Sequence, residues 1–110
     1  MIISWKDFEK VELRVGTIIS VEEFPKARKP AYKLKIDFGP LGIRQSSAQI
    51  TGLYRPEELL NRQIIGVTNF PPKQIADFRS ECLVTGVVDG DNPVVLIQPD
   101  RKVSNGLRIA

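Results

Sequence analysis

The chain contains no histidine, and this absence excludes more chemistry than any other feature of its composition. Histidine is the commonest general base and the commonest metal ligand in proteins. Zinc, Ser-His-Asp and Cys-His chemistry are therefore excluded. The chain also has a single cysteine, Cys82, so an internal disulfide is impossible. Its apolar neighbours predict a buried structural thiol.

Long hydrophobic runs are missing as well. No apolar segment approaches the roughly 20 residues that a membrane-spanning helix requires. The first residues lack the basic and then apolar pattern of a signal peptide, so we predict a cytoplasmic protein. The 110 residues, 42% of them apolar and 26% charged, suit one domain with a packed core.

No pattern of acids or glycines indicates an active site. Neighbouring carboxylates occur at Glu22–Glu23, Glu57–Glu58 and Asp89/Asp91, where a helix start or a turn accounts for most of them. A Gly-rich phosphate loop is absent. We therefore expect a protein that is not an enzyme and that uses neither a metal nor a cofactor.

The segment 12–23 is the element around which we expect the fold to form. Its side chains alternate in polarity almost strictly, with Ile18 as the exception. The predicted inward face consists of Leu13, Val15, Thr17, Ile19 and Val21. The segment is about twice the common strand length of roughly 5–6 residues, so it must coil around a small core. Gly16 is expected to permit the bend, because it lacks a Cβ.

The remaining segments predict further elements in a definite order. They are a short helix from Ser4, strands over 31–38 and 43–50, a short helix from Pro56, a strand over 63–70, a connection over 73–80, a strand over 82–88 and a hairpin strand over 94–98. A helix between the third and fourth strands of a five-stranded barrel is the OB-fold arrangement. The predicted fold is therefore all-β, a five-stranded OB-fold barrel with short helices and a C-terminal extension.

Basic residues gather in one part of this predicted barrel. Five cations fall between Lys26 and Lys35 with no acid among them. Others are predicted to lie nearby, namely Arg14, Arg44, Lys73 and Arg79. Together they would form a positive band able to follow a phosphate backbone. A solvated basic face without a partner is the alternative, and a net charge of +3 does not decide between them.

Aromatic residues make up only 7% of the chain, which limits the options for base stacking. Tyr32 and Phe38 share the apolar side of the strand over 31–38, so their pattern indicates core packing. Phe70, Phe78 and Tyr54 lie in or beside predicted loops. There they would pack against the loops or line an apolar groove.

Several motifs together resemble the tRNA-binding-domain superfamily. They are Asp7-Phe8, Leu13-Arg14-Val15-Gly16, Pro56-Glu57-Glu58-Leu59, and Asn69-Phe70-Pro71-Pro72-Lys73 followed by Ser80. That superfamily includes stand-alone tRNA-binding proteins and the C-terminal domain of bacterial methionyl-tRNA synthetase. Within it, the runs over 24–34, 46–51 and 69–73 resemble the CsaA group of secretion chaperones.

This resemblance implies a homodimer of OB-fold barrels. The N-terminal helix over 1–11 and a C-terminal dimerisation extension over 89–110 would join the subunits, and the barrel would occupy 12–88. CsaA-like proteins are regarded as export-related chaperones of unfolded or precursor polypeptides that also contact the export motor. Their relatives bind tRNA by shape rather than by sequence.

Three hypotheses about function follow, two of them main ones. A chaperone would bind peptides at Tyr32, Phe70, Pro71 and Phe78. An RNA-binding module would use Arg14, Lys33, Arg44, Asn69, Lys73, Arg79 and Ser80. The third reading is a dimeric barrel whose partner is another protein surface.

The chain departs from the tRNA-binding pattern at a few positions. Ala48-Gln49 stands where relatives carry Ser-Gly, and Asp77 replaces a glycine and puts an acid near the expected phosphate path. Leu83 stands where relatives carry methionine. These differences count against efficient tRNA binding more than against the fold.

Overall fold

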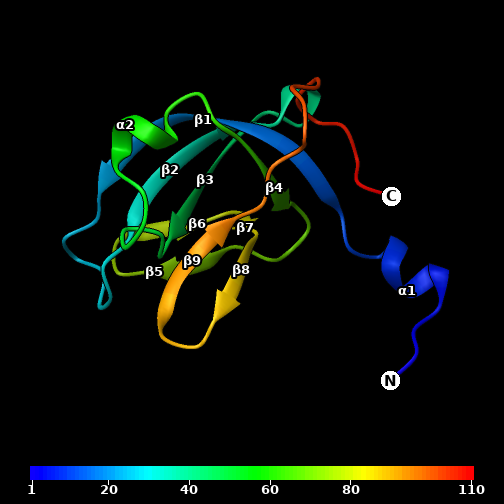
Figure 1. Cartoon of the computed structure of the whole chain (residues 1–110), viewed down its shortest axis with the longest axis horizontal. Helices are drawn as coiled ribbons and strands as arrows, with labels where there is room; N and C mark the ends of the chain where they lie inside the picture. The colour runs from blue at the N-terminus through cyan, green and yellow to red at the C-terminus, as the bar shows by residue number, and fades with distance from the viewer.

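One long strand, β1 (Leu13–Glu23), organises the main sheet. Its first half pairs antiparallel with β4 (Gln63–Val67) and its second half with β2 (Tyr32–Asp37). The strand order is β3-β2-β1-β4-β7, with β3 at Ile43–Ala48 and β7 at Leu83–Val84 (Figure 1). The computed structural model describes all residues, 1–110.

The two ends of this sheet come together and nearly close the barrel. The Glu81 N–H donates to the Gln45 carbonyl at 2.8 Å, which joins β3 to the segment before β7. A short helix, α2 (Pro56–Leu59), connects the third strand to the fourth, with Pro56 at its first position. The prediction of an all-β, five-stranded barrel with short helices is confirmed.

The barrel interior is built on the alternation in β2. Leu34 and Ile36 are fully buried, as is Phe38 just beyond the strand, and Tyr32 joins them. Leu59 of α2 closes one end of this core. The face that the sequence predicts for this strand is therefore confirmed.

The predicted inward face of β1 is partly wrong. A β-bulge between Ile18 and Ser20 shifts the register with β2, so the inward-facing positions change from even to odd. Ile18 is consequently fully buried in the core, whereas Ile19 is 39% exposed. Val21 does pack against the core. Val15 is buried outside that cluster, at the place where its backbone pairs with the C-terminal segment.

Two hairpins differ from the prediction. The segment 73–80 is not a plain connection but a hairpin of β5 (Lys73–Ile75) and β6 (Phe78–Ser80). The predicted single strand over 82–88 divides into β7 and β8 (Gly86–Asp89), and β8 pairs with β9 (Asn92–Leu96). The division falls at Thr85, whose N–H and hydroxyl both donate to the Ile65 carbonyl.

The N-terminal helix α1 (Trp5–Glu9) projects from the barrel (Figure 1). Ser4 begins it as predicted: its hydroxyl accepts from the Asp7 N–H, and the Asp7 carboxylate accepts from the Ser4 N–H. No residue of α1 is buried. A one-turn helix, η1 (Gly39–Leu41), joins β2 to β3. None of the helices is long and apolar enough to cross a membrane.

Candidate binding surfaces

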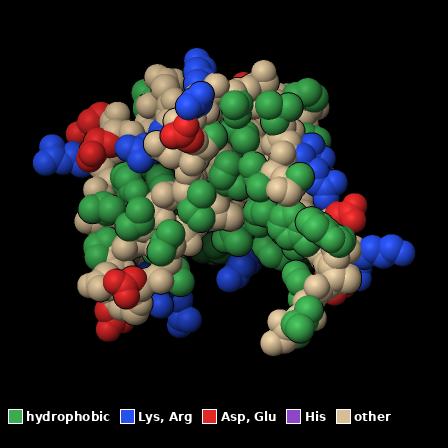
Figure 2. Space-filling view, turned by 45° about the vertical axis from the view of Figure 1, so that its right-hand side comes forward, with side chains coloured by type: hydrophobic (Ala, Val, Ile, Leu, Met, Phe, Trp, Pro, Cys, Tyr) green, Lys and Arg blue, Asp and Glu red, His purple; other side chains and the backbone are tan.

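An apolar groove of about 990 Å³ lies between the β5–β6 hairpin and the segment from β7 to β9. Among its 18 lining residues are Phe70, Pro71, Pro72, Ile75, Leu83, Val84, Val88 and Val94. Several are unusually open for their size, since Phe70 is 54% and Val88 78% exposed. Figure 2 shows how widely hydrophobic side chains extend over one face of the molecule. Exposed apolar area of this kind marks a binding surface.

The structure brings together only part of the predicted peptide site. Phe70 and Pro71 line the groove, but Tyr32 does not, because it belongs to the barrel core. Its hydroxyl donates to the Tyr54 carbonyl at 2.8 Å. Phe78 is also buried, in a second small cluster with Phe24. Both rings are therefore structural rather than groove-lining.

Sequence reasoning missed the far wall of the groove, which β7, β8 and β9 supply. Leu83, Val84 and Val88 come from a segment that the sequence predicts as one strand of the barrel. The apolar doublet Val87-Val88 was the available signal, because a strand with one buried face does not need two successive apolar residues. Cys82 lies at the base of the groove, and burial raises the pKa of its thiol to about 11.

A row of polar residues crosses four strands, and three of its members, Ser47, Lys73 and Ser80, line one border of the groove. Lys33 on β2 pairs with Ser47 on β3, and Lys73 on β5 pairs with Ser80 on β6. The Ser47 N–H donates to the Ser80 hydroxyl at 3.1 Å and so links the two halves. We call these four residues the basic row. Arg79, beside Ser80, is exposed on the same hairpin.

Lys33 is held in place by two aromatic rings. Its Nζ lies 4.8 Å from the centroid of the Phe24 ring and 5.5 Å from that of Phe78. The two rings pack against each other with their centroids 5.4 Å apart. Cation–π attraction therefore fixes the ammonium over this cluster.

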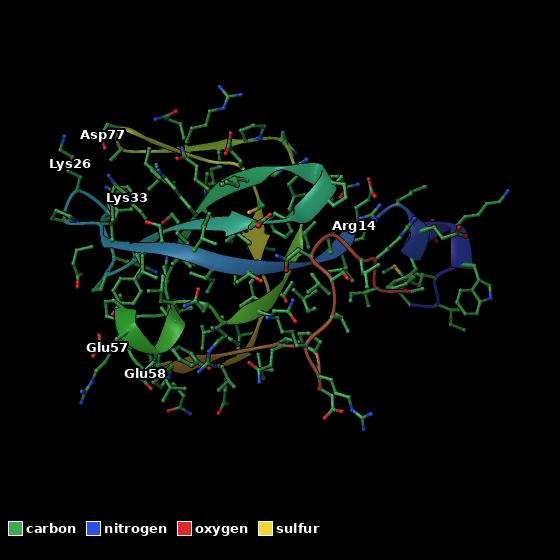
Figure 3. The ribbon with its side chains drawn as sticks, turned by 90° about the horizontal axis from the view of Figure 1, so that it is seen from above. Arg14, Lys26, Lys33, Glu57, Glu58 and Asp77 are labelled. Atoms are coloured by element: carbon green, nitrogen blue, oxygen red, sulfur yellow. The ribbon has the colours of Figure 1, made fainter.

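An ion pair ties the loop after β1 to the turn of the β5–β6 hairpin. The Lys26 Nζ lies 2.7 Å from the Asp77 Oδ2 (Figure 3). This hydrogen bond lowers the pKa of the Asp77 carboxyl and raises the pKa of Lys26. The positive charge of Lys33 also lowers the pKa of Asp77. Asp77 therefore interacts with both lysines.

Other predicted RNA contacts have partners inside the chain. Arg14 donates to the Glu12 carboxylate at 2.6 Å, which lowers the pKa of Glu12, and to the Gly106 carbonyl at 3.2 Å. Arg44 donates to the Thr68 carbonyl. The Asn69 amide accepts from the Glu12 N–H at 3.0 Å and donates to the Lys10 carbonyl at 2.6 Å. These contacts give all three side chains structural roles.

The predicted band of cations is therefore not one surface. Lys33 on β2 pairs with Glu22 on β1. Glu22 lies eight residues along β1 from Arg14, which corresponds to about 25 Å at the usual strand rise. Figure 3 shows Arg14 at the opposite end of the barrel from Lys33. Of the seven predicted residues, Lys33, Lys73, Arg79 and Ser80 lie together.

The paired acids serve the start of α2. Glu57 and Glu58 lie in its first turn, and the Glu58 carboxylate accepts from the Arg55 N–H at 3.0 Å. Figure 3 shows both at some remove from Lys26, Lys33 and Asp77. No group of three or more potential metal ligands is found in the chain.

The sequence matches one protein family over most of its length. The family described as "Putative tRNA binding domain" matches residues 13–108. Among curated relatives, the methionine–tRNA ligase of Pyrococcus horikoshii is 38% identical over 107 residues, which are 97% of this chain and 14% of the ligase. That of Porphyromonas gingivalis is 35% identical over 107 residues, 97% of this chain and 15% of the ligase. The chain thus spans about a seventh of these enzymes.

Solved structures of similar proteins cover the chain completely or almost so. The chaperone CsaA from Bacillus anthracis is 50% identical with a TM-score of 0.95, covering 100% of both chains. CsaA from Picrophilus torridus is 53% identical with a TM-score of 0.92, covering 99% of this chain and 100% of that one. A MetRS related protein from Pyrococcus horikoshii is 27% identical with a TM-score of 0.88, covering 100% of this chain and 99% of that one. The predicted resemblance is confirmed: the chain belongs to the tRNA-binding-domain family and is similar throughout to CsaA chaperones.

Proposed function

We propose that this protein is a CsaA-like chaperone that binds unfolded or precursor polypeptides in the apolar groove. The observation that carries the proposal is the exposure of Phe70, Leu83 and Val88 around one groove next to the basic row. A folded protein gains nothing from leaving such side chains in water, whereas an extended apolar client would bury them. The similarity to proteins described as chaperone CsaA supports this reading.

The groove also suggests what a client must look like. Its walls offer apolar contacts without a specific polar pattern, so many sequences with spaced apolar side chains would fit. Lys73 lies at the border and favours acidic over basic residues next to the apolar segment. Broad recognition of this kind suits a chaperone rather than a receptor for one ligand.

A matched pair of variants tests the groove. Phe70→Ala removes an exposed ring within it, and Ile43→Ala removes an equally exposed apolar side chain, 61% exposed, outside it. We expect Phe70→Ala to weaken binding of a labelled unfolded client by about 1–2 kcal/mol, roughly five- to thirtyfold, because aromatic anchors dominate such surfaces. Ile43→Ala should change it less than about twofold. Absence of binding to any unfolded client would refute the proposal.

The proposal includes a homodimer that acts in protein secretion in the cytoplasm and delivers clients to the export motor. Exposed apolar residues on the N-terminal arm, Met1–Glu9, support self-association, because they have no partner within one chain. Contact with the motor is testable by sedimentation with the purified export motor. Independent sedimentation of the two proteins at micromolar concentration would exclude that partner.

Binding of tRNA is the second candidate function. The family match, the exposed cations Lys73 and Arg79 and the half-buried Lys33, which the Ser47–Ser80 hydrogen bond brings to the same part of the molecule, favour it. Titration with tRNA should then show affinity falling with salt by a log–log slope of about 0.7–0.9 per phosphate contacted. Lys73→Ala should reduce the slope by one contact, whereas Lys102→Ala on the distant C-terminal segment should leave it unchanged. A flat salt dependence would remove this candidate.

A further inference from the structure

Asp77 is an acid beside the basic row whose carboxylate is paired with a lysine of another loop. It lies in the tight turn between β5 and β6, next to Ala76, whose φ is 52°. Its carboxylate reaches across to Lys26 on the loop that joins β1 to β2, with 2.7 Å between Oδ2 and Nζ. The contact therefore bridges two segments that both approach the row.

The structure beneath this ion pair holds it in position. Phe24 and Phe78 pack together below the loop and the turn, and Ala27 and Ile75 pack against them. Lys33 is fixed over the same two rings. Two cations and one carboxylate thus lie on a small apolar base, with Lys26 ion-paired to Asp77 and Lys33 in the field of the same carboxylate.

We propose that Asp77 is a selectivity residue that weakens the binding of phosphate backbones at the basic row and leaves the adjoining apolar groove unaffected. A phosphate that contacts Lys26 must displace the internal carboxylate. One that contacts Lys33 must approach Asp77 within a Debye length, where repulsion is only partly screened. An uncharged peptide segment in the groove meets neither cost. The inference rests on the proposed function, because Asp77 would favour polypeptides over tRNA, the two candidate ligands named there.

The test compares Asp77→Asn with Asp91→Asn, which makes the same charge change in the β8–β9 turn. At about 0.1 M salt we expect Asp77→Asn to bind tRNA roughly five- to tenfold more tightly, with a slope steeper by about 0.7–0.9, the value of one added phosphate contact. Asp91→Asn should change the affinity less than about twofold. Circular dichroism checks that both variants fold.

A second variant separates electrostatics from a structural effect of the turn. Lys26→Met keeps the aliphatic stem and removes the charge, so Lys26→Met combined with Asp77→Asn should lose most of the gain. A gain that persists in this double variant, an equal gain in Asp91→Asn, or no tRNA binding by any variant would overturn the inference.

Peptide binding supplies the independent readout. An uncharged labelled peptide with leucine at alternate positions should bind wild type and Asp77→Asn within about twofold of each other. If no variant binds this peptide or any other unfolded client, the chaperone proposal fails, while the tRNA comparison still decides whether Asp77 weakens phosphate binding. If Asp77→Asn changes peptide affinity as much as tRNA affinity, the residue is not selective and the inference fails.

Discussion

Single atoms at the centre of the barrel determine which residues fit there. The Phe38 ring lies against both Gly16 of β1 and Gly66 of β4. A Cβ at Gly16 would lie 2.6 Å from the Ile36 Cγ2 and 2.8 Å from the Phe38 ring. The sequence suggests that Gly16 permits a bend, and the pairing of β1 does pass from β4 to β2 at the next residue, Thr17. Gly16 is also required because the Phe38 ring needs the space that a Cβ would fill.

Gly16→Ala should therefore destabilise the fold by about 1–3 kcal/mol, the usual cost of overpacking a core. Urea unfolding followed by circular dichroism measures the loss. Phe38→Leu removes ring atoms and makes room, so the double variant should lose less stability than the sum of the two single changes. Simple additivity would show that the contact between Gly16 and Phe38 is not the cause.

Cys82 gives a prediction about pH. Burial raises the pKa of its thiol from 9.0 to about 11, because the charged thiolate is disfavoured inside the protein. Alkylation at pH 8 should be about a hundredfold slower in the folded chain than in urea, since the thiolate is the reactive form. The unfolded chain loses this proton near pH 9 and the folded chain only near pH 11. Stability should therefore fall as the pH rises through that window. Equal alkylation rates in folded and unfolded chain would contradict this.

At the scale of elements, the sequence predicts strands better than it predicts their irregularities. The alternation in β2 identifies its buried face correctly, since nothing interrupts the strand. No glycine or proline lies at the bulge in β1 to predict it. The only sequence signal was Ile18, the apolar residue that breaks the alternation. The β5–β6 turn escapes prediction for a similar reason, because Ala76-Asp77 contains no glycine or asparagine.

Tertiary burial accounts for the aromatic residues that the sequence assigned to the groove. Phe78 lies in the segment 73–80, which the sequence predicts to be a connection, so its ring was expected to be exposed. Once that segment forms a hairpin, Phe78 faces Phe24, and the two rings bury each other. A contact between residues so far apart in the chain leaves no local pattern, so the sequence could assign Phe70 and Pro71 to a groove but could not exclude Phe78 from it.

Asn69 links two elements and supports a prediction at the same scale. Its amide holds the Lys10 carbonyl and the Glu12 N–H, so it fastens the base of α1 to the end of β4. Asn69→Ala should speed amide hydrogen exchange across 5–11 by roughly tenfold, since losing about 1–2 kcal/mol of hydrogen bonding favours local opening. Exchange in β1 and β2 should remain unchanged. Asn92→Ala, in an exposed turn, is the matched control, and equal effects of the two would refute the role of Asn69.

The molecule as a whole leaves many large apolar side chains exposed. Apart from those of the groove, some of them lie on two projecting parts, the N-terminal arm and the outer side of the β8–β9 hairpin, where Trp5 and Val87 are open to solvent. Both parts extend from a barrel whose own core is complete (Figure 1). A second copy of the chain is the partner that would cover them, as the proposed homodimer requires.

Trp5 makes this testable without a label, because it is the single tryptophan and is 81% exposed in one chain. If the arm packs on a second copy, tryptophan emission should move to shorter wavelength as the protein concentration rises through the dissociation constant. Trp5→Ala should raise that constant about tenfold or more, because buried tryptophans are common hot spots. Lys6→Ala on the same helix should change it little. Sedimentation equilibrium gives the mass directly, and a stable monomer with unchanged emission at all concentrations would show that the arm serves another purpose.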